Sequence, residues 1–174
     1  MPLRALILIG VLAAAGPAMA GDAKCIWAHL PGSGRDSYLL AGLKDHRPDI
    51  MDHFSEAQLG LALNACQVRD AAMEPAGLAF SGYTGQLIAE RRLEILTNVY
   101  PAQLDAAWAD QDPGVVAALA QEVARGTDTG AGLKVWDRLI AKLSPAASDL
   151  AALKLELISY MSSRATRQAN EKLY

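Results

Sequence analysis

The chain has 174 residues, in which 16 lysines and arginines face 19 aspartates and glutamates, giving a formal net charge of −3 at pH 7. This length is enough for one domain with a substantial hydrophobic core. The sequence has neither the basic face that nucleic-acid binding needs nor a basic amphipathic helix for a membrane surface, so neither partner is expected.

Residues 1–20 have the three parts of an export signal. Residues 1–4 give a positive start, residues 5–15 are apolar, and residues 18–20 (Ala-Met-Ala) offer the small-x-small pattern of a cleavage site. The apolar run is well short of the roughly 20 residues that span a bilayer. We therefore predict cleavage after Ala20 and a periplasmic or secreted protein with no membrane span in its mature chain.

The mature chain, residues 21–174, is predicted to form a single helical domain. Its first part, residues 21–35, is expected to be irregular, with a turn at the Pro-Gly-Ser-Gly sequence, and a short helix is expected over residues 36–44. Alternating apolar patterns and β-branched runs are hard to find along the chain. These observations predict an all-α bundle of about six or seven helices.

Residues 55–68 are predicted to be the central, buried helix of this bundle. Apolar residues surround most of the circumference of such a helix, which is typical of burial on several sides. Ser55 and Gln58, three residues apart, form a capping box at its start. The segment also carries Cys66, which we expect to pair with Cys25, because an even pair in an oxidising compartment favours a disulfide over free thiols. The spacing is unlike that of redox-active C-x-x-C motifs.

In the rest of the chain, apolar residues recur with the periodicity of a helix, in segments with recognisable boundaries. Residues 75–99 read either as one long helix whose glycines admit a close neighbour, which we favour, or as a helix that begins near Thr84. Residues 126–132 are expected to form a loop, and residues 162–174 to be frayed. Further helices are predicted over residues 102–110, 114–124, 133–143 and 145–170.

The segment of residues 45–53 holds the one dense group of titratable, ligand-type side chains. If Pro48 begins a helical turn, Asp49 and His53 lie four apart on one face, and His46 is close in sequence. Such residues could share a metal ion or form an acid–base pair. The favoured interpretation is a solvated capping segment, because no H-x-x-x-H or H-E-x-x-H spacing is present. His46, Asp49 and His53 are therefore weak metal candidates, and no cofactor is predicted.

Three functions follow from this reading. The leading one is an exported, non-catalytic helical protein that binds another envelope or secreted protein. The second is a metal-dependent hydrolase centred on residues 45–53. The third is a carrier of a small apolar ligand, with its pocket between helices where the glycines of residues 75–85 thin the packing.

Overall fold

The computed structural model describes residues 22–143, 150–171 and 173, and this part of the chain folds into α-helices and two short 3-10 helices, with no strand. The all-α prediction is confirmed. In chain order the elements are α1 (Ala23–His29), α2 (Gly32–Lys44), η1 (Ile50–Asp52), α3 (Glu56–Ala65), η2 (Asp70–Ala72), α4 (Met73–Thr97), α5 (Pro101–Ala109), α6 (Pro113–Arg125), α7 (Ala131–Leu143) and α8 (Leu150–Glu171).

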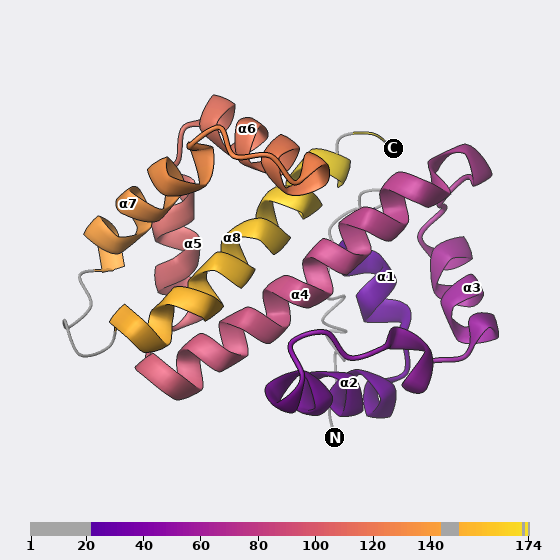
Figure 1. Cartoon of the computed structure of the whole chain (residues 1–174). Coiled ribbons are helices and arrows are strands. Elements are labelled where there is room, and N and C mark those ends of the chain that lie inside the picture. The colour runs from indigo at the N-terminus through magenta and orange to yellow at the C-terminus, as the bar shows by residue number, and fades with distance from the viewer. Residues whose placement is uncertain (1–21, 144–149, 172, 174) are drawn as a thin grey trace, which may run out of the picture.

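The long helix α4 is the centre of the molecule, and it packs along most of its length against α8 (Figure 1). The two helices run antiparallel and approach closely because α4 presents glycine at the contact. A Cβ atom added to Gly82 would lie 2.6 Å from the backbone oxygen of Ser163, and one added to Gly85 would lie 2.6 Å from the Ser163 hydroxyl oxygen. The favoured prediction for this segment, one helix whose glycines admit a neighbour, is confirmed.

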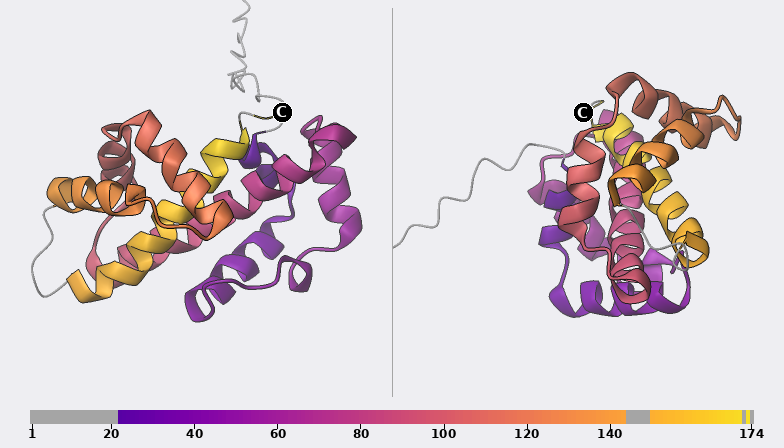
Figure 2. Two further views of the ribbon diagram at one scale, coloured as in Figure 1. Left: turned by 45° about the horizontal axis from the view of Figure 1, so that its top comes forward. Right: turned by 90° about the vertical axis from the view of Figure 1, so that its left-hand side faces the viewer.

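Two apolar clusters flank α4. Figure 2 shows the helices that carry them, with α5 to α8 toward one end of α4 and α1 to α3 toward the other in its left-hand view. One cluster joins α4 to α5, α6, α7 and α8 around side chains such as Leu104, Val135 and Tyr160. The other joins α4 to α1, α2 and α3 around Ile26 and Phe54. None of the helices that the structure describes is long and apolar enough to cross a bilayer.

The predicted disulfide is confirmed. Cys25 in α1 and Cys66 at the end of α3 are joined by an S–S bond of 2.09 Å, with their Cα atoms 5.8 Å apart. The bond ties the first helix to the end of α3. Closing a loop of 41 residues stabilises the folded chain by about 4 kcal/mol on the chain-entropy model.

The position predicted for the central helix is wrong. The capping box of Ser55 and Gln58 is present, but α3 is a peripheral helix in which Ala62 alone is buried, while Leu61 is 69% exposed. The buried face of α3 is the narrow line from Ala62 to the disulfide at Cys66, because α3 packs on α1 and has no second partner of similar extent. Most of the apolar residues around α3 therefore do not pack against another helix.

Both predicted irregular ends are also more ordered than expected. In the first, α1 begins at Ala23 because the Asp22 carboxylate accepts a hydrogen bond from Lys24 N at 2.9 Å, and α2 begins at Gly32, inside the expected turn. In the second, α8 continues to Glu171, and Ala165 is fully buried against the bundle. The predicted export signal and residues 144–149, where the last helix was expected to begin, lie outside the described residues.

Candidate functional site

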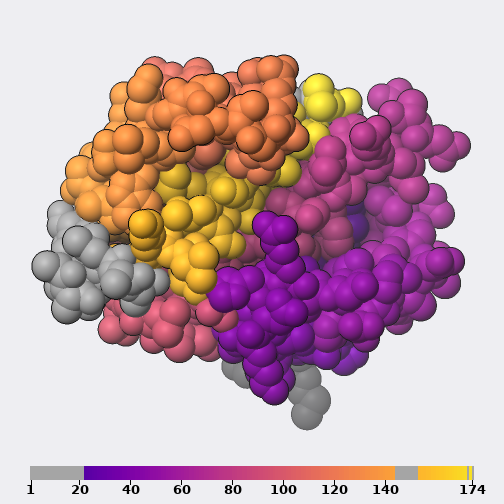
Figure 3. Space-filling model, viewed as in Figure 1, coloured from indigo at the N-terminus to yellow at the C-terminus, as the bar shows by residue number. Residues whose placement is uncertain are grey.

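An open groove of about 530 Å³ lies where the loop after α2, α4 and α8 meet. Figure 3 shows this face: α8, in yellow, is exposed between the purple segment that follows α2 and the orange segment before α7. The volume lies in the range of ligand-binding clefts. The residues lining it are Tyr38, His46, Arg47, Pro48, Ser81, Gly82, Gly85, Val123, Leu155, Ile158, Ser159, Ser162, Ser163 and Thr166.

One end of the groove carries the positive charge of Arg47. His46 and Arg47 lie on its rim, and no aspartate or glutamate is among the described residues that line it. His46 is held in place from behind, where its Nε2 donates a hydrogen bond of 3.0 Å to Oε1 of Glu156, a residue that is only 2% exposed. A carboxylate oxygen accepts, so the ring nitrogen that faces Glu156 is the donor of this bond.

The carboxylate of Glu156 is shared with Arg92. Arg92 Nε lies 2.9 Å from Glu156 Oε1, within ion-pair distance, and its Nη1 donates to the carbonyl oxygen of Leu43 at the end of α2. The buried acid on α8 therefore holds both the loop of His46 and, through Arg92, the end of α2. The other oxygen, Oε2, has no hydrogen-bond partner among the described residues. Removing Arg92 would leave the buried Glu156 carboxylate with His46 as its remaining partner found among the described residues.

The walls of the groove combine hydroxyl groups with exposed apolar side chains. The hydroxyls come from Ser81 on α4 and from serines and a threonine on α8. Tyr38 adds a phenol whose pKa is raised by burial, so that it remains a neutral donor, here to Thr84. Leu155, Ile158 and Val123 are 59%, 45% and 40% exposed. The groove can thus hydrogen-bond a polar chain and bury an apolar side chain together.

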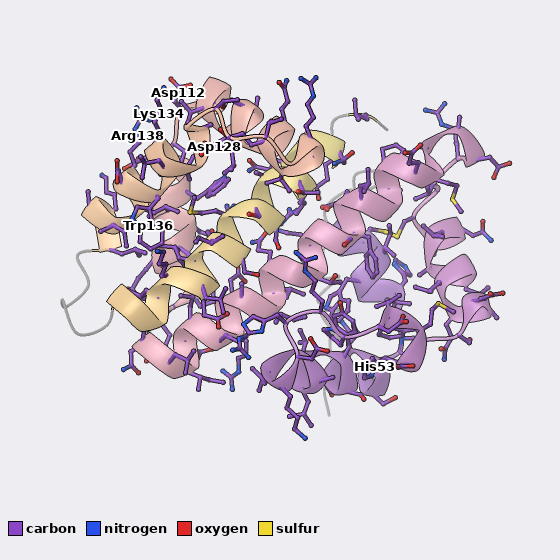
Figure 4. The ribbon with its side chains drawn as sticks, in the orientation of Figure 1. His53, Asp112, Asp128, Lys134, Trp136 and Arg138 are labelled. Carbon is purple, nitrogen blue, oxygen red and sulfur yellow. A yellow bond between two sulfur atoms is a disulfide. The ribbon has the colours of Figure 1, made fainter. Side chains whose placement is uncertain are left out.

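The structure does not bring the three weak metal candidates together. His46 contacts Glu156, the Asp49 carboxylate accepts from Met51 N at 2.9 Å and caps η1, and His53 Nδ1 lies 2.9 Å from the Ser37 hydroxyl oxygen. In Figure 4 His53 lies beside α2, on the opposite side of the molecule from the labelled charges of α6 and α7. Within the described residues, the converging group of metal-ligand type is instead Cys25, His29 and Cys66.

Two pairs resemble parts of a catalytic triad but lie at different places. His46 has a buried carboxylate partner, and the hydrogen bonds found among the described residues do not include one from a serine to its ring. His53 has a serine partner, and its other nitrogen has no carboxylate among the contacts found for the described residues. Acyl transfer by a catalytic triad needs a nucleophile hydrogen-bonded to a base, which is in turn hydrogen-bonded to an orienting acid. Neither pair supplies this set.

Glu156 is the residue of this site that sequence reasoning missed. It lies on the buried stripe of α8 between Leu153 and Tyr160, where the periodicity calls for an apolar side chain. A glutamate on such a stripe is a signal in itself, because a buried carboxylate needs a partner. Its partner His46 is 110 residues away in the chain, so the sequence could not supply the pair.

The charged side chains of residues 90–94 have three different surroundings. Arg91 and Glu94 form an ion pair of 2.6 Å on the surface, while Arg92 turns to Glu156. Glu90 is buried and accepts from Gln86 Nε2 at 2.6 Å. Burial raises the pKa of Glu90, against the opposing effect of the Gln86 hydrogen bond.

A second, smaller groove of about 400 Å³ lies between α2 and α4. Its apolar lining includes Leu40, Leu43 and Leu87, and its charged lining residues are Glu90, Arg91 and Glu94. Nothing about its chemistry selects one kind of occupant over another. Its residue Leu40 therefore offers a position for a control substitution in a binding experiment.

Comparison of the chain with protein-family models, with curated proteins and with solved structures finds no match.

Proposed function

We propose that this is an exported, non-catalytic binding protein whose groove between the α2 loop, α4 and α8 takes a segment of another envelope or secreted protein. The observation that carries the proposal is the pairing of exposed apolar side chains, Leu155 and Ile158, with the positive charge of Arg47 and with hydroxyl groups that line the same groove. Exposed apolar side chains rimmed by polar groups mark interaction surfaces.

The lining indicates the chemistry of the occupant. A segment with an aspartate or glutamate fits the end with Arg47, since no acidic side chain among the described lining residues opposes it. An apolar side chain of the same segment fits against Leu155, Ile158 and Val123. The hydroxyls of α8 can bond the N–H and C=O groups of an extended backbone.

The groove also sets the length of the segment. Leu155 and Thr166 line its two ends on α8, and eleven residues of helix correspond to about 17 Å. An extended chain covers about 3.3 Å per residue, so the groove accommodates roughly five residues. We therefore propose a short acidic and apolar peptide segment as the occupant.

The two other functions receive less support from the geometry. A hydrolase centred on residues 45–53 would need His46, Asp49 and His53 to converge, and each has a different partner. A carrier of an apolar ligand would need an enclosed apolar cavity. The groove beside Gly82 and Gly85 is where that carrier pocket was expected, but it is open, and six of its fourteen lining residues carry a hydroxyl group.

Location outside the cytoplasm is part of the proposal. It is supported by the Cys25–Cys66 disulfide, since such bonds persist in oxidising compartments. It is also supported by the signal pattern of residues 1–20. Detection of the processed chain, beginning at Gly21, in the periplasmic or secreted fraction is the expected result, and an unprocessed chain confined to the cytoplasm would contradict it.

A displayed library of random peptides tests the binding site directly. The library is selected on the oxidised protein and counter-selected on Ile158→Asp, which places a charge in the groove without removing a buried side chain. We expect enriched peptides that carry an acidic residue within a few positions of a large apolar one. Leu40→Asp, in the second groove, is the matched control, and it should retain the same peptides.

Three outcomes would overturn the proposal: no enrichment over the counter-selected variant, enrichment of basic peptides, or equal loss of binding with Leu40→Asp. A circular dichroism spectrum of each variant checks that it is folded, because both substitutions are at exposed positions and should leave the helices intact.

A further inference from the structure

Three side chains that can bind a metal converge at the junction of α1 and α3. Cys25 and His29 lie four residues apart on one face of α1, and Cys66 is the C-cap of α3. His29 Nδ1 lies 3.6 Å from the sulfur of Cys25 and 3.6 Å from the sulfur of Cys66. All three ligand atoms fall within 4.8 Å of one another. The yellow bond between α1 and α3 in Figure 4 marks the two sulfurs.

We propose that reduction of this disulfide converts the junction into a binding site for Zn²⁺ or a similar thiophilic cation, with Cys25, Cys66 and His29 as ligands. A dithiol reductant supplies two electrons and two protons, breaks the S–S bond and leaves two thiols. The cation then displaces the thiol protons and is held by two thiolates and one imidazole nitrogen. The site is independent of the groove and of the function proposed for it.

The distances fit a tetrahedral ion. With Zn–S near 2.3 Å and Zn–N near 2.0 Å, the nitrogen-to-sulfur edges of a tetrahedron measure about 3.5 Å, and the sulfur-to-sulfur edge about 3.8 Å. Both nitrogen-to-sulfur distances, at 3.6 Å, already have this length. Only the S–S separation of 2.09 Å must open, which is what reduction allows.

Access and support are also present. Cys25 and Cys66 are buried in a packed cluster that includes Ile26 and Ala62, while His29 is exposed and gives a route from solvent. His29 Nδ1 now donates to the carbonyl oxygen of Cys25 at 2.9 Å. To ligate a cation, this nitrogen must give up that hydrogen bond, and the ring must take the neutral tautomer that carries its proton on Nε2. Three protein ligands leave a fourth position for water.

The alternative is that His29 has a purely structural role. A histidine in the last turn of a helix satisfies a carbonyl oxygen, as His29 does. In that case any affinity of the reduced protein for a cation comes from the two thiols alone. Replacing His29 would then leave that affinity unchanged.

Cobalt titration of the mature protein distinguishes the two readings. The protein is reduced with a phosphine under anaerobic conditions, freed of reductant and titrated with Co²⁺, whose thiolate complexes absorb by charge transfer. We expect this absorption in the reduced form, none in the oxidised form, and displacement of Co²⁺ by Zn²⁺. His29→Ala should weaken binding at least tenfold. His53→Ala, which alters a histidine outside the site, should bind as the unmodified protein does.

Absence of the charge-transfer absorption in the reduced protein would overturn the proposal, as would equal affinity in His29→Ala. Far-UV circular dichroism is recorded alongside. If reduction unfolds the chain, Zn²⁺ must restore its helicity, and failure to do so also overturns the proposal.

Discussion

Glu122 and Glu90 are both buried glutamates, yet their surroundings have opposite effects on the charge. The Glu122 carboxylate accepts hydrogen bonds from the Thr129 hydroxyl and from the backbone N–H groups of Thr129, Ala131 and Gly132. These bonds, that of the Thr129 hydroxyl first, lower the pKa of Glu122 to about 2. This carboxylate closes the loop between α6 and α7 through these bonds; Figure 4 labels Asp128 of that loop and Lys134 of α7.

Replacing Glu122 by glutamine should therefore destabilise the protein, whereas the same change at Glu90 should not. Glu122→Gln places an amide NH₂ where N–H donors point, and should lower the free energy of unfolding by about 1–3 kcal/mol. Glu90→Gln removes a carboxylate whose pKa is raised by burial and keeps an acceptor for Gln86, so at pH 7 it should be neutral or stabilising. Urea denaturation of both variants measures this, and a loss of similar size in both would contradict the assignment.

The pH dependence has a defined sign. Because the folded pKa of Glu122 is depressed, its stabilising effect is complete above the unfolded value of about 4.5 and is lost as the pH falls from there toward 2. The unmodified protein should lose stability over this window more steeply than Glu122→Gln. Denaturant midpoints measured between pH 2 and pH 6 test this, and parallel curves would exclude the carboxylate as the cause.

At the scale of the element, the pairing of α4 and α8 depends on the absence of a side chain at one position. A methyl group at Gly82 would lie 2.6 Å from Ser163 O and 2.7 Å from Arg167 N, both backbone atoms. Gly82→Ala should force the helices apart and lower the free energy of unfolding by about 1–3 kcal/mol.

Gly77→Ala is the control in the same helix. A Cβ atom added there would have nothing within 4 Å, so this change should raise the free energy of unfolding by up to about 1 kcal/mol. Thermal unfolding of the two variants should shift in opposite directions; equal shifts would show that helix propensity alone decides.

The disulfide is the other element-scale link. Cys66→Ser should lower the free energy of unfolding by about 2–5 kcal/mol, because α1 then loses its covalent tie to α3. The unmodified protein, once reduced in the absence of metal, should match the variant. Denaturation of the oxidised, reduced and variant proteins makes the comparison, and a variant as stable as the oxidised protein would show that packing alone holds α1.

Sequence reasoning succeeded where the cause was local. The capping box at Ser55, the disulfide and the continuity of α4 depend on neighbouring residues, on residue type or on compartment. It failed where a second element decided the outcome. Leu61 is apolar but has no helix to meet, and α1 forms in a segment whose turn residues suggested a loop.

At the scale of the whole molecule, the same limit explains the site. The segment of residues 45–53 does contribute to the groove, through His46, but its partners come from α4 and α8. Glu156 could be recognised in the sequence as a misplaced charge on an apolar stripe. The partners of Glu156 could not be recognised in the sequence, because the ion pair forms only after two distant helices have packed.

The central claim is that the groove recognises an acidic and apolar peptide through Arg47 and Ile158. The most direct measurement is calorimetric titration of a selected peptide, and of its Glu-to-Lys counterpart, against the unmodified protein and Arg47→Glu. We predict that each charge reversal alone weakens binding about tenfold, that the two together restore most of it, and that Leu40→Asp leaves it unchanged. The account would be contradicted if the two charge reversals together weakened the affinity further instead of restoring it, or if Leu40→Asp weakened the affinity as much as Arg47→Glu.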